Sequence, residues 1–148
     1  MPDFQIVHAT AAHLPGVLEL YSFLGDNPMP EITDEITALW EHIVTNPRQT
    51  VLVGMLDGQA VSTCVVMIIE NLTHDQRPYA IVENVVTRPE MRGSGYATAV
   101  LDAAREIARK HNCYKISLTT GTKRDSTMNF YRRAGYNSAD KTAFVQWL

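Results

Sequence analysis

Positive charge is scarce in this sequence. Its 148 residues include 13 lysines and arginines against 16 aspartates and glutamates, which leaves a formal net charge of −3. Because domains that bind nucleic acid usually carry a basic surplus, nucleic acid is not an expected partner. Cysteine is scarce as well: Cys64 and Cys113 lack the spacing of metal ligands, so we expect no bound metal. Two isolated cysteines are typical of reduced thiols in a cytoplasmic protein.

Long hydrophobic runs are also missing. The longest, AVSTCVVMII, contains Ser62 and Thr63 and is far shorter than the roughly 20 residues that span a membrane. The first residues, MPDFQIVHAT, lack the cationic lead and the apolar stretch of a secretory signal. We therefore expect no membrane association. The length suits one hydrophobic core and not two, so residues 1–148 are expected to form a single domain.

Hydrophobic periodicity predicts a series of strands and helices. Residues 49–71 are predicted to form a hairpin around Asp57-Gly58, a strong signal for a two-residue turn. Helices are predicted over 10–24, 32–46, 96–111 and 125–134, and strands over 4–9, 79–87, 114–120 and 141–148. This order favours an α/β (α+β) fold with a mixed, mostly antiparallel central sheet flanked by about four helices.

The most informative stretch is RPEMRGSGYA, which joins the strand at 79–87 to the long helix. An ordinary helix favours acidic residues in its first turn, whereas this one follows Arg92, Gly93 and Gly95. Free amides at a helix N-terminus bind anions, and glycine lets an anion approach closely. The turn therefore indicates a phosphate site, although a glycine turn that only links strand to helix has the same sequence.

Two common phosphate loops do not fit this stretch. A Walker loop ends in Gly-Lys-Ser/Thr, a triplet that the sequence lacks. A dinucleotide-binding loop needs a third glycine where Thr98 stands, and an acidic residue about 20 positions further on, where the sequence is CYKISL.

The pattern that does fit belongs to a family. RGSGYA matches Arg/Gln-x-x-Gly-x-Gly/Ala through Arg92, Gly95 and Ala97, and STMNFYRRAGY carries a later Phe-Tyr-x-x-x-Gly-Tyr/Phe element. Together, in this order, they resemble the GNAT superfamily of acyl-CoA-dependent N-acyltransferases. YAIVENVV and CYKISL look most like the glucosamine-6-phosphate N-acetyltransferase branch, but Asn84 replaces that branch's aspartate and the segment 119–125 differs.

The resemblance implies an N-acetyltransferase domain that uses acetyl-CoA as its cosubstrate. The backbone of the strand before the loop would pair with the pantetheine arm, and the loop amides would hold the pyrophosphate. Ser126 and Thr127 would reach the cofactor from the short helix, although Ser126 could equally cap that helix. The implied cofactor-binding residues are Val85, Val86, Thr87, Arg92, Gly93, Ser94, Gly95, Tyr96, Ala97, Ser126 and Thr127.

Two side chains are candidates for proton transfer. Tyr131 is the candidate acid, since a tyrosine with a pKa of about 10 is protonated at neutral pH and can donate to a departing thiolate. Helical geometry directs Phe130 and Ala134 to the core and Tyr131 to a cleft. Glu83 is the candidate base, acting directly or through water. Strand alternation places Glu83 and Asn84 on opposite faces of the strand, and burial would make the Glu83 carboxylate a stronger base. The alternative for Tyr131 is a side chain that only packs against the core. The alternative for Glu83 is a structural hydrogen bond to the neighbouring strand.

The expected acceptor is a primary amine of a small molecule. Under the resemblance, Tyr21, Phe23 and Met29 would line its pocket, and Asn84 would orient it or simply tie strands together. No cysteine lies in either motif, so direct attack in a ternary complex is expected without a covalent enzyme intermediate. A non-catalytic acyl-CoA sensor is the alternative function, and it would need neither the acid nor the base.

The last residues, KTAFVQWL, are apolar, with Trp147 near the end. They fit either an edge strand of the core or a strand that takes part in a homodimer.

Overall fold

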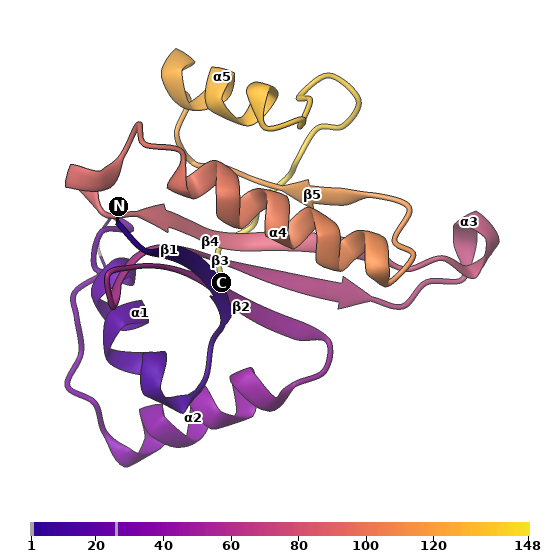
Figure 1. Ribbon diagram of the computed structural model, residues 1–148. Coiled ribbons are helices and arrows are strands. Elements are labelled where there is room, and N and C mark those ends of the chain that lie inside the picture. Colours follow the sequence, from indigo (N-terminus) through magenta and orange to yellow (C-terminus); the bar gives the residue numbers. More distant parts are fainter. Residues whose placement is uncertain (1, 26) are drawn as a thin grey trace.

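The computed structural model describes residues 2–25 and 27–148, which form a five-stranded sheet with helices on both faces (Figure 1). The strands are β1 (Phe4–His8), β2 (Gln49–Leu56), β3 (Gln59–Ile69), β4 (Tyr79–Thr87) and β5 (Ile116–Leu118). The helices are α1 (Leu14–Tyr21), α2 (Asp34–Thr45), α3 (Thr73–Gln76), α4 (Tyr96–Lys110) and α5 (Asp125–Arg133), with short 3-10 turns η1 (Ala11–His13) and η2 (Pro89–Met91).

The sheet has the strand order β1-β2-β3-β4-β5. The first four strands form an antiparallel meander, and β5 runs parallel to β4. The predicted turn at Asp57-Gly58 joins β2 to β3 with φ values of 48° and 83°, which this dipeptide tolerates. The expected mixed, mostly antiparallel sheet is therefore confirmed, and α1, α2, α4 and α5 are the four expected helices.

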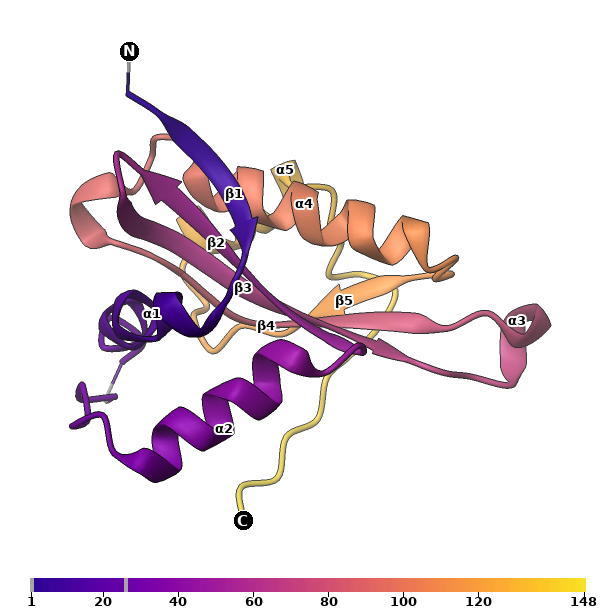
Figure 2. The same cartoon turned by 60° about the horizontal axis from the view of Figure 1, so that its bottom comes forward.

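Each face of the sheet has its own hydrophobic core. In Figure 2, α4 lies on one face and α1 and α2 lie on the other. We call these the α4 core and the α1/α2 core. The α4 core contains Cys64, Val66, Val82, Val100, Leu101 and Ala104, and the α1/α2 core contains Val17, Leu20, Trp40, Val53, Val65 and Val86. In the described part of the chain, no helix combines the length and the apolar character needed to cross a membrane.

β4 contains a bulge that simple alternation did not predict. Asn84 and Val85 together face the single residue Cys64 of β3. Asn84 has φ 53°, a left-handed conformation that Asn adopts more readily than most residues. Strict alternation along β4 would place Val82, Asn84 and Val86 on one face, and this expectation is wrong: Val82 packs in the α4 core and Val86 in the α1/α2 core.

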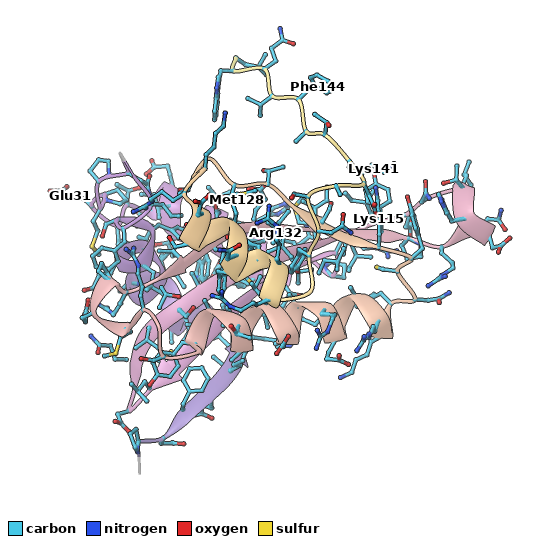
Figure 3. The ribbon with its side chains drawn as sticks, turned by 90° about the horizontal axis from the view of Figure 1, so that it is seen from above. Glu31, Lys115, Met128, Arg132, Lys141 and Phe144 are labelled. Carbon is cyan, nitrogen blue, oxygen red and sulfur yellow. The ribbon has the colours of Figure 1, made fainter. Side chains whose placement is uncertain are left out.

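The predicted final strand is not formed within the chain. Residues 141–148, which we call the C-terminal arm, have no regular secondary structure. Figure 3 shows Phe144 of this arm well away from the sheet and helices. β5 is also shorter than the predicted 114–120. Because a strand is held by ladder hydrogen bonds to a neighbour, a segment with no neighbouring strand does not become one, whatever its propensity.

A buried arginine joins α1 to the end of β4. Arg88 is 5% exposed, and its Nε donates to the Ala60 carbonyl at 2.7 Å. Its two terminal nitrogens hold the Glu19 carboxylate at 2.9 and 2.7 Å, a two-pronged geometry that suits this pairing. The hydrogen bond from Arg88 lowers the pKa of Glu19. The pair therefore fixes α1, and Tyr21 at its end, against the residue that precedes the glycine loop.

We expect Glu19→Gln to destabilise the fold by about 1–3 kcal/mol, because the buried Arg88 charge loses its counter-ion. The folded-state pKa of Glu19 is depressed, so its contribution is present above about pH 5 and is lost as the pH falls through that folded-state pKa. The difference in free energy of unfolding between wild type and Glu19→Gln should therefore become smaller as the pH falls. Urea unfolding at a series of pH values between about 3 and 7 measures both effects.

The matched control is Glu70→Gln. Glu70 also pairs with an arginine, Arg48, but both side chains are at least half exposed. Its replacement should therefore change the free energy of unfolding by about 0.5 kcal/mol or less. Equal losses in the two variants would show that the Arg88 pair is no stronger than a surface ion pair.

Candidate functional site

The site begins where β4 and β5 separate. These two strands pair over three rungs and part after Val82 and Leu118. Beyond Val82, no strand of the described chain covers this edge of β4, whereas its other edge stays paired with β3. The side chains of Val86 and Thr87 are buried, so only their backbone groups can meet a ligand here. The open edge contains the predicted residues Val85, Val86 and Thr87.

The glycine loop follows this edge after Arg88 and the turn η2, and it leads into α4. Gly93 and Gly95 have φ values of 78° and 88°, which only glycine adopts at little cost. Gly95 is the N-cap of α4 and offers no side chain to the helix amides, and the first turn of α4 contains no acidic residue. The free amides and the positive end of the helix dipole are therefore available to an anion. Residues 92–95 are exposed, and Tyr96 and Ala97 are partly exposed, so the six predicted loop residues lie together at the surface.

Tyr131 is half-buried on α5, where its ring lies 5.0 Å from that of Phe130 and 6.3 Å from that of Tyr136. As predicted, Phe130 and Ala134 pack against the α4 core, and Tyr131 also contacts it. Burial raises the pKa of Tyr131 above its ordinary value. The hydroxyl group therefore stays protonated at neutral pH, as an acid must before it donates.

Glu83 lies on the opposite face of the sheet from Tyr131. It pairs directly with Val65 of the α1/α2 core, and directly paired residues share a face. The burial that would have strengthened Glu83 as a base is absent: Glu83 is exposed, because it is the first residue of β4 beyond the last rung with β5. An exposed carboxylate at this position is accessible to water, so proton transfer through water is the route that this geometry favours.

Tyr21 and Asn84 meet on the same side as Glu83. Burial raises the pKa of Tyr21, and the nearby Asn84 side chain, which can donate to the Tyr21 hydroxyl oxygen, opposes the rise. The ring of Phe23 lies 5.9 Å from the guanidinium carbon of Arg88. Met29 is 49% exposed, and its place in the pocket stays a prediction. Asn84 is thus tied to the wall that the sequence predicted for the acceptor.

Ser126 and Thr127 lie in the first turn of α5. Ser126 is exposed and Thr127 is half-buried. The N-cap of α5 is Arg124, so the alternative reading of Ser126 as the cap is wrong, and contact of either residue with a cofactor stays a prediction. In residues 2–25 and 27–148, no three His, Cys, Asp or Glu side chains are grouped so that they could hold a metal ion.

Sequence reasoning missed two contacts of this site. One is the pair of Arg88 and Glu19, for which an arginine directly after a buried apolar strand was the available signal. The other is the approach of the Asn84 side chain to the Tyr21 hydroxyl group, for which no sequence signal existed, because it depends on the bulge.

Solved structures resemble the chain over nearly its full length. A putative acetyltransferase from Agrobacterium tumefaciens str. C58 superposes with a TM-score of 0.91 at 36% identity, and the match covers 97% of this chain and 99% of that one. A glucosamine-6-phosphate N-acetyltransferase from Arabidopsis thaliana has a TM-score of 0.85 at 20% identity, with 98% of each chain covered. At that identity the second likeness shows the fold alone.

Sequence comparison gives the family. A glucosamine 6-phosphate N-acetyltransferase from Trypanosoma brucei brucei is 30% identical over 84 residues, which make up 57% of this chain and 55% of that protein. The match therefore spans about half the length of this curated relative. The model of the Acetyltransferase (GNAT) family matches residues 17–136, a range that includes the glycine loop and the Phe-Tyr element. A match of this extent shows that the chain belongs to the acetyltransferase (GNAT) family, with the predicted likeness to the glucosamine-6-phosphate branch.

Proposed function

We propose that this protein transfers an acetyl group from acetyl-CoA to a primary amine of a small molecule, by direct attack in a ternary complex. The observation that carries the proposal is the continuity of the open β4 edge with the glycine loop. The edge offers backbone hydrogen bonds to an extended arm, as an added strand would use them. The loop offers amides and a positive helix end to a phosphate at the end of that arm.

Two proton transfers accompany the reaction. The acceptor amine must lose a proton before its nitrogen attacks the thioester carbonyl, and Glu83 takes this proton through water. When the carbon–sulfur bond breaks, the thiolate takes a proton from Tyr131. Glu83 and Tyr131 lie on opposite faces of the sheet, so acid and base approach the opening beside β4 from different sides.

The acting unit is proposed to be a cytoplasmic homodimer. The free cysteines support a reducing compartment: Cys64 is buried and Cys113 is half-buried, and burial raises the pKa of the Cys64 thiol to about 12. The exposed apolar C-terminal arm supports association.

Gly95→Ala should weaken CoA binding about 5- to 30-fold, because alanine disfavours the φ of 88° at this position by about 1–2 kcal/mol and the free loop relaxes away from the binding conformation. Gly58→Ala is the matched control, since its φ of 83° carries a similar backbone cost in the β2–β3 turn. Calorimetric titration with CoA measures the dissociation constant of both variants. A wild-type protein without affinity for CoA would contradict the proposal, and tight binding without thioester consumption across a panel of amines would identify a sensor.

Tyr131→Phe should lower kcat about 100-fold or more, while the dissociation constant for acetyl-CoA changes less than about threefold. The phenyl ring keeps the packing of Tyr131 and removes its proton. Tyr136→Phe is the control: it belongs to the same aromatic group, and burial raises the pKa of Tyr136 to about 12. Steady-state kinetics of both variants test whether Tyr131 is the acid. Equal kcat values for Tyr131→Phe and wild type would exclude Tyr131 from the mechanism.

Glu83→Gln should lower kcat/KM about 10- to 100-fold near neutral pH and flatten the acidic limb of the pH–rate profile. The amide keeps the size and some hydrogen bonds of the carboxylate, but it cannot take a proton. Glu41→Gln, an exposed position on α2, should leave the profile unchanged. An unaltered pH–rate profile in Glu83→Gln would show that Glu83 is not the base.

A further inference from the structure

The glycine loop has little support of its own. Residues 92–95 are exposed, and two of the four are glycines, whose backbone is the least restricted of all residues. In the described chain, a single hydrogen bond joins this loop to β4: the Nε of Arg92 donates to the Thr87 carbonyl at 3.3 Å. The conformation that presents the loop amides to an anion therefore depends on how the far end of the loop is held.

That far end is Tyr96, the first residue of α4. Its ring packs against the ring of Phe4, the first residue of β1, with a centroid separation of 4.7 Å and an angle of 41° between the planes. Aromatic rings at this separation attract one another. Figures 1 and 2 both show the start of β1 at the end of the molecule where α4 begins. An edge strand thus supports the residue that closes the loop.

Gly54 on β2 makes room for the Phe4 ring. A Cβ atom at Gly54 would lie 3.0 and 3.1 Å from two carbons of this ring and 3.5 Å from Cγ1 of Val100. Carbon atoms in favourable contact stay about 3.5–4.0 Å apart, so any residue larger than glycine would displace the ring. Val100 belongs to α4 and lies about one turn after Tyr96. Phe4 therefore sits between the sheet and the first turns of α4.

The start of β1 is itself fixed in place. The Asp3 amide donates to Oδ1 of Asp57 at 2.9 Å, and the Asp57 amide donates to the Asp3 carbonyl at 2.9 Å. Phe4 pairs directly with Leu56 of β2. These contacts tie the residues around Phe4 to the β2–β3 turn, so the ring is a fixed support for Tyr96 and not a mobile one.

We propose that Phe4 is a positioning residue for the cofactor: it holds the Tyr96 ring, and through this ring it keeps the glycine loop in the conformation that binds the diphosphate of CoA. The inference rests on the CoA binding proposed above. Without the Phe4 ring, the loop amides are still present, but only a fraction of the molecules holds them in the binding conformation. The apparent dissociation constant rises in inverse proportion to that fraction.

A double-mutant cycle measured by calorimetric titration with CoA tests whether Phe4 acts through Tyr96. Phe4→Leu and Tyr96→Leu should each raise the dissociation constant about 5- to 20-fold, and both variants keep every loop amide. The double variant should bind about as weakly as either single variant, because the two rings act as one unit. Unchanged affinity in Phe4→Leu, or two effects that multiply in the double variant, would overturn the proposal.

The control for a general loss of stability is Trp40→Phe. Trp40 is 5% exposed in the α1/α2 core, and its Nε1 donates to the Thr10 carbonyl at 3.0 Å. The substitution loses this hydrogen bond and some packing, but it lies in the core on the other face of the sheet from α4. Its dissociation constant for CoA should stay within about twofold of the wild-type value. A loss of affinity as large as that of Phe4→Leu would show that loosening anywhere in the fold is sufficient.

Hydrogen exchange without CoA gives an independent measurement. The Ala99 amide donates to the Gly95 carbonyl at 3.0 Å and so reports on the start of α4, whereas the His111 amide donates to the Ile107 carbonyl at its end. Phe4→Leu should raise the exchange rate of the Ala99 amide at least about tenfold and leave that of His111 unchanged. Equal acceleration at both amides would show that the whole helix has loosened, which contradicts a local role for Phe4.

These measurements separate the positioning role from the proposed function. A wild type that does not bind CoA contradicts the proposed function and the role of Phe4 in it. Wild-type binding of CoA, with an unchanged Ala99 exchange rate in Phe4→Leu, overturns the positioning role alone and leaves acetyl transfer standing.

Discussion

The early separation of β4 from β5 is the constraint on which the site depends. Three rungs hold these strands together, and after Val82 the edge of β4 is free. If the pairing continued, β5 would occupy the backbone hydrogen-bonding groups of residues 85–87 and leave no place for an extended ligand. The same strand then runs into the glycine loop, so one continuous stretch of backbone supplies both the edge and the anion site. The proposed anion site needs no basic surplus, because backbone amides would carry the binding.

The bulge at Asn84 ties the acceptor side to this opening. The extra residue turns Val85 toward the α4 core and Val86 toward the α1/α2 core, and it sets Asn84 against Tyr21. Tyr21 ends α1, which Glu19 fixes to Arg88 at the end of the same strand. β4 therefore touches α1 at both ends of the open edge, so the proposed acceptor wall and the proposed cofactor edge are held in one frame.

The features that the sequence predicted well are local. Asp57-Gly58 specifies its turn through its own backbone preferences, and Gly93 and Gly95 specify theirs. The buried stripe of α4 repeats within one helix, so its period is visible without any partner. The elements that failed depend on a neighbour. A bulge is set by the register of two strands, which no property of β4 alone determines, and the exposure of Glu83 follows from where β5 ends. The arm has the residues of a strand but pairs with no strand of its own chain.

The environments of the two proposed proton carriers suit the direction in which protons move. Burial keeps Tyr131 protonated, so a proton is present when the thiolate forms, and little water competes for it. Glu83 is exposed, so the proton that it takes can pass on to solvent between turnovers. A buried base would hold its proton, and an exposed acid would exchange its proton with bulk water. The sheet keeps the two side chains apart: Tyr131 packs against the α4 core, and Glu83 lies on the face of the α1/α2 core. In the proposed mechanism, the separation of the two cores would therefore serve the chemistry as well as the packing.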